Sequence, residues 1–406
     1  MDPRNIRIQD YSYFLPEEKI ARHPLATRDS SKLLIYKAGN IQEDVYKNIA
    51  THLPENAHII FNNTKVIEAR LHFQKPTGGV IEIFCLEPSA QYPDITTAMT
   101  QHGTVFWNCL IGGASKWKHG MILEKKLKTS SDELVLTARI HKREKDTFMI
   151  EFSWNPPTFG FAEVLHMAGA IPLPPYIKRE AEPDDAVRYQ TIYARESGSV
   201  AAPTAGLHFS PAIFSELESK RIKTDYITLH VGAGTFKPVK SETMDAHEMH
   251  PEFFEVSREF IQSLLSSRIR IAVGTTTART LESIYWLGVK TIQDPEISLH
   301  HLHLEQWEAY DLPQQASVKD AITHLVDWMK RNQLDNLITK TRLLIAPGYQ
   351  IKVFNILVTN FHQPQSTLLL LVAAVAGKNW RNIYDHALLQ DYRFLSYGDG
   401  CLIYVE

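Results

Sequence analysis

The chain has 406 residues, with 43 lysines and arginines against 46 aspartates and glutamates, which gives a formal net charge of −3 at pH 7. A hydrophobic fraction of 44% and a charged fraction of 22% exclude a wholly disordered chain. The charge balance argues against a general nucleic-acid coat protein but is compatible with a local RNA-binding patch. Three widely separated cysteines without a Cys-x-x-Cys pair argue against a disulfide scaffold and a zinc ribbon.

Neither the start of the chain nor its interior carries a membrane signal. The first residues, MDPRNIRIQDYSYF, lack the apolar core of a signal peptide. The longest apolar run, Leu368 to Ala376, is too short to cross a bilayer. We therefore expect a cytoplasmic protein with no membrane partner.

Residues 1–70 mix helical and extended patterns. The segment SSKLLIYKAG predicts a short strand that enters a turn at Gly39. A buried strand is predicted at 59–61, and it ends at Asn62-Asn63.

Residues 71–154 show a different pattern, in which apolar and polar residues alternate. Alternation recurs in GGVIEIFCLEP, TVFWNCLIGG, MILEKKLKT, DELVLTARIHK and TFMIEFSW, and turn residues separate these runs. Such a succession is typical of a small antiparallel barrel or sandwich.

Basic residues gather in this part of the chain. They are Lys116, Lys118, Lys125, Lys126, Lys128, Arg139, Lys142, Arg143 and Lys145. Two interpretations stay open: solvated hairpin edges that discourage strand pairing, or a patch that contacts RNA phosphates.

From residue 160 onward, strands alternate with helices. Ser210-Pro211 predicts a helix start, with serine as N-cap and proline at the first helical position. TDYITLHVG predicts a strand, and RIRIAVG predicts a strand that leads into the helix TTTARTLESIYWLG. Repeated strand–helix units indicate an α/β domain with ligands near the strand carboxyl ends.

The C-terminal third continues this alternation. RLLIAPGYQIKVFNILVTNF predicts two strands around Pro347-Gly348, and QSTLLLLVAAVAG predicts a buried helix that ends at Gly377. We therefore predict an α/β fold: a mixed α/β main domain of residues 1–70 plus 155–406, with 290–341 as an elaboration, and an inserted antiparallel β-barrel domain of residues 71–154.

The first candidate ligand loop is GSVAAPTAGLHF, residues 198–209. Small residues let the backbone approach a ligand closely, and the hydroxyl groups and His208 supply hydrogen bonds. Tight packing against a neighbouring helix would also explain the small residues.

A second loop, HVGAGTF at 230–236, follows a predicted strand. A third glycine is missing and Pro238 interrupts the expected helix, so a standard dinucleotide site is not expected. A ligand-facing loop remains the prediction.

The segment His247-Glu248-Met249-His250-Pro251-Glu252 places two histidines among carboxylates. It could hold a metal, perform acid–base chemistry or form an ordinary loop, and acid–base chemistry or substrate contact is favoured over a metal.

Three further loops lie at expected strand ends. Gly274-Thr275-Thr276-Thr277 opens a helix, where free N–H groups could bind a carboxylate or phosphate, although threonine capping would explain it equally. Asn360-Phe361-His362-Gln363-Pro364 and Tyr397-Gly398-Asp399-Gly400 occupy similar positions.

Taken together, these stretches resemble one family, the S-adenosylmethionine:tRNA ribosyltransferase-isomerases of queuosine biosynthesis. The resembling segments run in order from residue 13 to 400 and include YFLPEEKIARHPLATRDSSKLL, FNNTKVIEARL, IPLPPYIKR, RYQTIYARESGSVAAPTAGLHF, LHVGAGTFKPV, HEMHPE, VGTTTARTLES, NFHQP and YRFLSYGDG. The sequence differs from the family pattern at Gln363 and at Gly400-Cys401.

The resemblance implies an α/β main domain with an inserted β-barrel. It also implies transfer of the ribosyl part of S-adenosylmethionine to a 7-aminomethyl-7-deazaguanine base at the tRNA wobble position. Epoxyqueuosine in tRNA would form, with release of adenine and methionine. S-Adenosylmethionine is then a substrate, and no cofactor or metal is expected.

The implied chemistry needs proton-transfer groups near neutral pKa and a polar substrate site. The catalytic candidates are His208, His250, Glu252 and Asp399. The substrate-binding candidates are Arg70, Lys178, Arg179, Ser199, Thr204, His230, Gly232, Gly234, His247, Thr275, Arg279, Glu282, Asn360 and His362. Phe209 and Phe236 could face the sulfonium, and Arg279 with the threonine loop would suit the methionine carboxylate.

The implied partner is the anticodon loop of tRNA, bound by a monomer. Two alternatives stay open: an enzyme that uses S-adenosylmethionine with another amine acceptor, and a non-catalytic tRNA-binding relative. A metal-dependent hydrolase built on the HEMH segment is a third.

Overall fold

The structure is a computed structural model. It describes residues 2–75, 77–92, 94–118, 120–128, 133–144, 147–232, 239 and 241–406. Gly234, Phe236 and Lys145, which the sequence analysis singled out, lie outside the described residues. None of the helices in the described ranges has the length and apolar character that a bilayer crossing requires.

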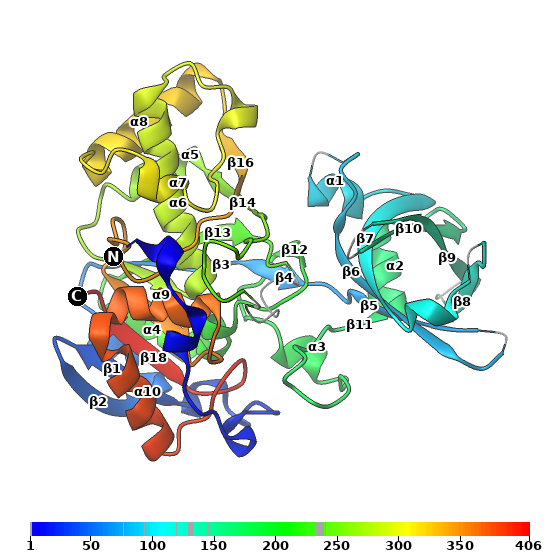
Figure 1. Cartoon of the computed structure of the whole chain (residues 1–406), viewed down its shortest axis with the longest axis horizontal. Helices are drawn as coiled ribbons and strands as arrows, with labels where there is room; N and C mark the ends of the chain where they lie inside the picture. The colour runs from blue at the N-terminus through cyan, green and yellow to red at the C-terminus, as the bar shows by residue number, and fades with distance from the viewer. Residues whose placement is uncertain are drawn as a thin grey trace.

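A nine-stranded sheet runs through the larger body of the molecule (Figure 1), with the strand order β16-β14-β13-β3-β15-β17-β18-β1-β2. Its strands are β1 Lys32–Lys37, β2 Asn40–Val45, β3 His58–Asn62, β13 Lys223–Leu229, β14 Glu252–Ser257, β15 Arg270–Val273, β16 Asn336–Thr341, β17 Ile356–Asn360 and β18 Gly400–Tyr404. Strands β13, β3, β15 and β17 are parallel, so their carboxyl ends meet at one edge. The antiparallel β18 begins at that edge, where Gly400 pairs with Asn360.

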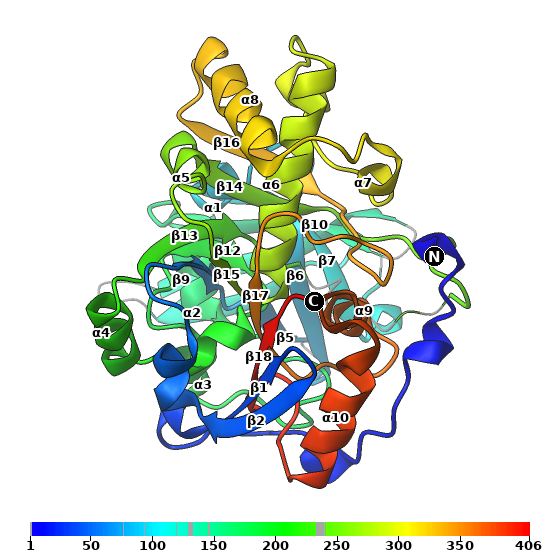
Figure 2. The same ribbon diagram turned by 90° about the vertical axis from the view of Figure 1, so that its left-hand side faces the viewer.

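Helices cover both faces of this sheet. They are α4 Pro211–Ser219, α5 Arg258–Ser263, α6 Thr275–Gln293, α7 Glu308–Asp311, α8 Val318–Arg331, α9 Thr367–Ala376 and α10 Trp380–Leu389, while the short α3 Asp185–Arg188 lies in a connecting segment. Alternate strand residues face opposite sides. Leu34 and Leu357 pack in the cluster that contains α5, α6, α8, α9 and α10, whereas Leu33 and Val358 pack with α4. Figure 2 shows α4 and the α9–α10 pair on opposite sides of the sheet.

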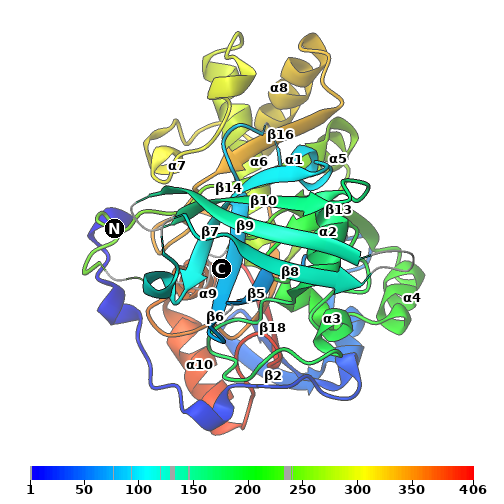
Figure 3. The same ribbon diagram turned by 90° about the vertical axis from the view of Figure 1, so that its right-hand side faces the viewer.

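A seven-stranded antiparallel sheet forms a second body (Figures 1 and 3), with the order β11-β5-β6-β7-β10-β9-β8. Its strands are β5 Arg70–Gln74, β6 Val80–Pro88, β7 Thr104–Gly112, β8 Leu123–Lys128, β9 Glu133–Arg143, β10 Phe148–Asn155 and β11 Gly169–Ala170. It encloses its own apolar cluster, to which the helix α2 Phe161–Ala168 contributes, and the short helix α1 Ile95–Met99 lies beside it. The sheet curls until β5 and β8 approach each other, but no ladder joins them within the described ranges, so a closed barrel is not confirmed.

A short two-stranded sheet connects the bodies. Its parallel strands are β4 Thr64–Val66 and β12 Glu196–Ser199. The mixed α/β character and the five alternating runs of the second sheet agree with the prediction. The sheet also recruits β11 from beyond residue 154, because its residues pair with β5.

Several predicted boundaries are confirmed by local chemistry. Ser210 caps α4 by accepting a hydrogen bond from the Ile213 N–H at 3.4 Å. Helix α9 ends at Gly377, which has a φ of 55°.

The prediction for residues 342–346 is wrong. The strand of this region is β16, which ends at Thr341, and the following apolar residues are irregular. Leu344 and Ile345 are buried, and the Tyr310 hydroxyl donates to the Leu344 carbonyl at 2.8 Å. An apolar run buried by surrounding loops reads like a strand in sequence.

Residues 290–341 belong to the main core. They supply the end of α6, α7, α8 and the edge strand β16. Leu325 and Trp328 of α8 are fully buried in the same cluster as Leu34 of the central sheet. The segment therefore extends the main sheet and its helical layer.

Candidate active site

A cavity of about 810 Å³, its open mouth included, lies at the edge where β15 and β17 end. Its walls are Tyr176, Tyr189, residues 201–205, Val231, residues 274–276, Thr359, Asn360, His362, Gln363, Ser366, Leu368, Leu395 and Ser396. In α/β sheets ligands bind outside the carboxyl ends of the strands.

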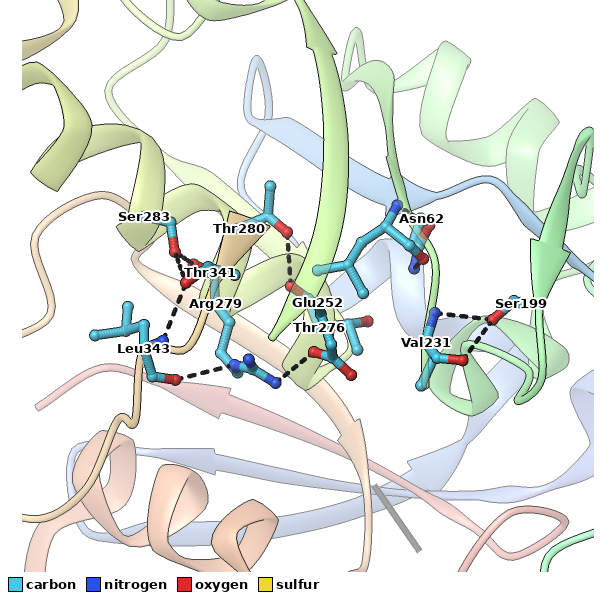
Figure 4. A network of polar contacts seen from close by, with 11 residues as sticks. Asn62, Ser199, Val231, Glu252, Thr276, Arg279, Thr280, Ser283, Thr341 and Leu343 are labelled. Atoms are coloured by element: carbon cyan, nitrogen blue, oxygen red, sulfur yellow. Dashed lines mark hydrogen bonds and ion pairs between the residues drawn. The ribbon is translucent and has the colours of Figure 1, made fainter. Parts of the chain in front are cut away.

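One wall is the small-residue loop after β12. The hydroxyl of Ser199 donates to the Ala201 carbonyl at 2.7 Å. It also accepts from the Val231 N–H at 3.0 Å, a contact drawn in Figure 4. These contacts tie the loop to the segment after β13. Within it, Gly206 passes so close to Tyr193 that an added Cβ would lie 1.9 Å from the phenol oxygen. Thr204 lines the cavity, while Ser199 supports its wall from behind.

A second wall is the start of α6. Gly274 has a φ of 90°, a conformation that favours glycine, and turns the chain from β15 into the helix. Thr275 and Thr276 follow and line the cavity. The free N–H groups of a helix start carry partial positive charge, so this wall suits an electron-rich ligand group.

The third wall lies at the end of β17, and two histidines, His362 in the wall and His208 behind it, contact its polar side chains. The Asn360 side-chain nitrogen lies 3.3 Å from the His208 Nε2, and the Thr359 hydroxyl lies 2.8 Å from the His362 Nε2. Burial lowers the pKa of His208 and of His362 to about 4, and for His208 the charges of Arg393 and Arg28 act in the same direction. Both rings are therefore neutral at pH 7, and the lowered pKa also makes each a weaker base than a free imidazole.

Glu252 and Arg279 form a buried ion pair instead of lining the cavity. The Arg279 Nη1 lies 2.6 Å from the Glu252 carboxylate, and the two side chains are 8% and 6% exposed. The Arg279 Nε donates to the Leu343 carbonyl at 3.1 Å (Figure 4). The pair fastens α6, whose first turn faces the cavity, to β14.

Two other carboxylates from the list of predicted site residues, Glu282 and Asp399, accept hydrogen bonds from backbone N–H groups. Glu282, fully buried, accepts from the N–H groups of Lys352 at 2.9 Å and Val353 at 2.8 Å. Asp399 accepts from the N–H groups of Lys32 at 3.0 Å and Arg393 at 2.7 Å. These contacts hold loops in place and leave neither group among the cavity walls.

The predicted histidines of the 230–250 region are dispersed. His230 is half-buried, with its Nδ1 3.1 Å from the Thr64 hydroxyl, and desolvation lowers its pKa to about 4. His247 is half-buried and its carbonyl accepts from Gln306, whereas His250 is exposed. The described ranges contain no group of three metal-binding side chains, so nothing there supports a metal at the HEMH segment.

The remaining predicted residues lie away from the cavity walls. Arg70 on β5 pairs with Glu82 at 3.5 Å. Lys178 is exposed and pairs with Glu17 at 3.0 Å. Arg179 forms a 2.6 Å ion pair with Asp185, Gly232 has open space around it, and Phe209 packs in the core.

Four predicted substrate-binding residues thus meet at one cavity: Thr204, Thr275, Asn360 and His362. Sequence reasoning missed Tyr176, Tyr189, Thr359 and Ser396, which line the same space. Tyr176, Tyr189 and Ser396 belong to segments that carry the family resemblance. Nothing in their local pattern distinguishes them from core residues.

Comparisons with known proteins place this geometry in context. A family model described as queuosine biosynthesis protein matches residues 8–403. Relatives named S-adenosylmethionine:tRNA ribosyltransferase-isomerase are 35% identical: in Magnetococcus marinus over 405 residues, covering 98% of this chain and 94% of the relative, and in Aquifex aeolicus over 406 residues, covering 98% and 100%.

A solved structure also matches. The crystal structure of S-adenosylmethionine tRNA ribosyltransferase from Thermotoga maritima shares 27% identity, covers 97% of this chain and 99% of that one, and has a TM-score of 0.45. That score is too low to establish a common arrangement, so the assignment of the family depends on the sequence matches.

Proposed function

Since the chain belongs to the queuosine biosynthesis protein family, we propose that it transfers and isomerises the ribosyl moiety of S-adenosylmethionine onto 7-aminomethyl-7-deazaguanine at the tRNA wobble position. The products are epoxyqueuosine-tRNA, adenine and methionine. S-Adenosylmethionine is consumed as the ribosyl donor.

The observation that carries this proposal is the cavity bounded by the 201–205 loop, the start of α6 and the end of β17. It lies at the strand edge where an α/β fold binds its ligand. Its mostly apolar walls carry a few polar side chains, among them Thr204, Asn360 and His362, which suits a ligand that has both apolar and polar groups.

The reaction requires proton transfers without a change of redox state. The sulfonium acidifies the adjacent 5′ hydrogens, so that a base removes one of them and adenine leaves. The amine then attacks the sugar, and epoxide closure expels methionine. His362 is the candidate proton acceptor because its neutral ring lines the cavity. His208, held against Asn360, positions that amide.

The tRNA reaches the site through its anticodon loop, where a base can be turned out of its stack. We assign residues 71–154 to an inserted barrel domain whose exposed basic side chains contact RNA phosphates. Those on β8 and β9 include Lys126, Lys128, Arg139 and Lys142. Some of them already pair with carboxylates, as Lys126 does with Glu133 at 2.9 Å. The protein acts in the cytoplasm as a monomer.

The test is an incubation with S-adenosylmethionine and tRNA that carries the 7-aminomethyl base, with EDTA present. Released adenine is quantified and the digested nucleosides are analysed by mass spectrometry. Adenine together with an epoxyqueuosine mass is the expected result. The variant Asn360→Ala should lose most of this activity, whereas Asn382→Ala, at an exposed asparagine of α10, should retain it.

The other outcomes identify different functions. Adenine that forms equally without the modified tRNA indicates another amine acceptor. Bound tRNA with intact S-adenosylmethionine indicates a non-catalytic relative. Activity lost specifically in EDTA indicates a metal requirement and contradicts the proposed proton-transfer chemistry.

A further inference from the structure

A second, smaller cavity adjoins the first. It measures about 260 Å³, its open mouth included, and its walls include Arg28, Arg188, Ser31, His208, Ser396 and Tyr397. Ser396 also lines the larger cavity, and the ring of His208 lies 3.3 Å from Asn360 of that cavity. A group held in the small cavity is therefore next to a molecule held in the large one.

The two arginines of this cavity are fixed by backbone oxygens. Arg28 donates to the carbonyls of Gln190 at 2.8 Å, Leu207 at 3.2 Å and Val187 at 2.8 Å. Arg188 donates to the carbonyls of Ala26 at 3.3 Å and Leu25. These contacts hold both guanidinium groups in place before a ligand binds, so little conformational entropy is lost on binding.

Neither guanidinium group has a directly paired carboxylate, although the charge of Asp184 acts on Arg28 from farther away. No carboxylate in the described ranges lies within 4.0 Å of either guanidinium group. The Arg188 Nε is buried and has no hydrogen-bond partner among the described residues. Burial lowers the pKa of Arg28, and the charge of Arg188 lowers it further. Two like charges beside an empty space are stabilised when an anion enters it.

A guanidinium group has five N–H donors. The backbone contacts above use three donors of Arg28 and two of Arg188. The guanidinium N–H groups that these contacts leave unused are available to an oxyanion in the cavity. A tetrahedral phosphate or a planar carboxylate would satisfy them.

The absence of Asp and Glu from the walls of the small cavity favours a phosphate over the carboxylate end of an amino acid. An amino-acid end group carries an ammonium as well as a carboxylate, and a buried ammonium needs an anionic or polar acceptor. No Asp or Glu is among the walls of the small cavity. A phosphodiester carries only negative charge and therefore matches the cavity better.

We propose that Arg28 and Arg188 bind a backbone phosphate of the RNA next to the nucleotide whose base enters the large cavity. This inference rests on the proposed function. The phosphate fixes the register of the strand, so that the acceptor amine and the ribosyl donor meet at the large cavity.

The test measures tRNA binding across salt concentration for Arg188→Gln, Arg188→Lys and the control Arg381→Gln. The probe is tRNA with the 7-aminomethyl base. Arg381 is matched, because it too donates to two carbonyls, those of Ser12 at 3.3 Å and Asp10 at 3.2 Å, and it lies outside both cavities. Melting temperatures check that each variant is folded.

Losing one phosphate contact should reduce the slope of log K against log salt by about 0.7–0.9. Arg188→Gln is expected to show this change and about tenfold weaker tRNA binding at moderate salt. Arg188→Lys keeps the charge, so it should keep the slope. Arg381→Gln should keep both slope and affinity, and the binding of S-adenosylmethionine should be unchanged in all variants.

An unchanged slope for folded Arg188→Gln overturns the phosphate site. Weaker S-adenosylmethionine binding with an unchanged tRNA slope overturns it in favour of the methionine carboxylate. Failure of the proposed function gives a different result. The wild-type protein then binds this tRNA with an undiminished slope of log K against log salt, but it releases no adenine.

Discussion

The buried pair between Glu252 and Arg279 leads to a sharp prediction. Their side chains are 6% and 8% exposed and 2.6 Å apart. In Glu252→Gln the guanidinium stays buried without its counter-charge, and breaking such a pair costs about 3–5 kcal/mol. At about 2.1 cal/mol/K per residue, unfolding 406 residues has an entropy of about 0.85 kcal/mol/K. The melting temperature should therefore fall by about 4–6 °C.

The assay combines differential scanning calorimetry with turnover. A double-mutant cycle with Arg279→Met isolates the pair, and the double variant should be less destabilised than the sum of the single variants. Because Glu252 acts through the position of α6, Glu252→Gln should keep turnover within about tenfold at temperatures below its own melting.

The control is Asp327→Asn, which breaks an exposed ion pair with Lys330 at 3.2 Å, where the side chains are 59% and 54% exposed. Such pairs contribute about 0–1 kcal/mol, so the melting temperature should shift by about 1 °C at most. The reasoning is refuted if Glu252→Gln behaves like this control in calorimetry yet loses about 100-fold or more in turnover. Glu252 would then take part in the chemistry.

Three further predictions concern packing, pH and the cavity. Gly288→Ala places a Cβ 2.2 Å from the Ala321 carbonyl oxygen, where α6 meets α8. It should lower the free energy of unfolding, measured by urea titration, by about 1–3 kcal/mol. A variant as stable as the wild type would contradict this close approach. His362 has its pKa lowered from 6.5 to about 4, so the unfolded chain binds more protons between these values and stability is lost as pH falls from 6.5 toward 4. His362→Gln should therefore show a smaller difference in melting temperature between pH 7 and pH 5, and an unchanged difference would refute the shift. Asn360→Ala removes the contact with His208 and should lower turnover at least about tenfold while the melting temperature stays within about 2 °C; a large loss of stability would instead make Asn360 structural.

Much of the fold could be predicted because the relevant physics is local. Alternation sets which side chains share a face of a strand, and it located β6 through β10. Caps and glycines act within a few residues, which is why the start of α4 and the end of α9 were predicted correctly. The run at 342–346 failed because burial by distant loops imitates the apolar pattern of a strand.

The candidate site divides in the same way. Motifs at strand ends identified Thr204, Thr275, Asn360 and His362, since the carboxyl ends of parallel strands converge on one edge. Tyr176 and Tyr189 line the same cavity from a connecting segment, and no local sequence pattern predicts that they do.

The sequence by itself therefore predicted many of the strands and helices, the family, and several residues that meet at one edge of the main sheet. These predictions follow from short-range pattern and motif. The tertiary structure decided which polar residues face the cavity and which instead form hydrogen bonds and ion pairs that hold loops and helices in place. Asp399 holds the Lys32 N–H across 367 residues of chain, and Glu252 is neutralised by Arg279. Burial, which is a property of the whole fold, lowers the pKa of His208 and His362. Contacts between distant segments and the loss of solvent around them exist only once the chain has packed.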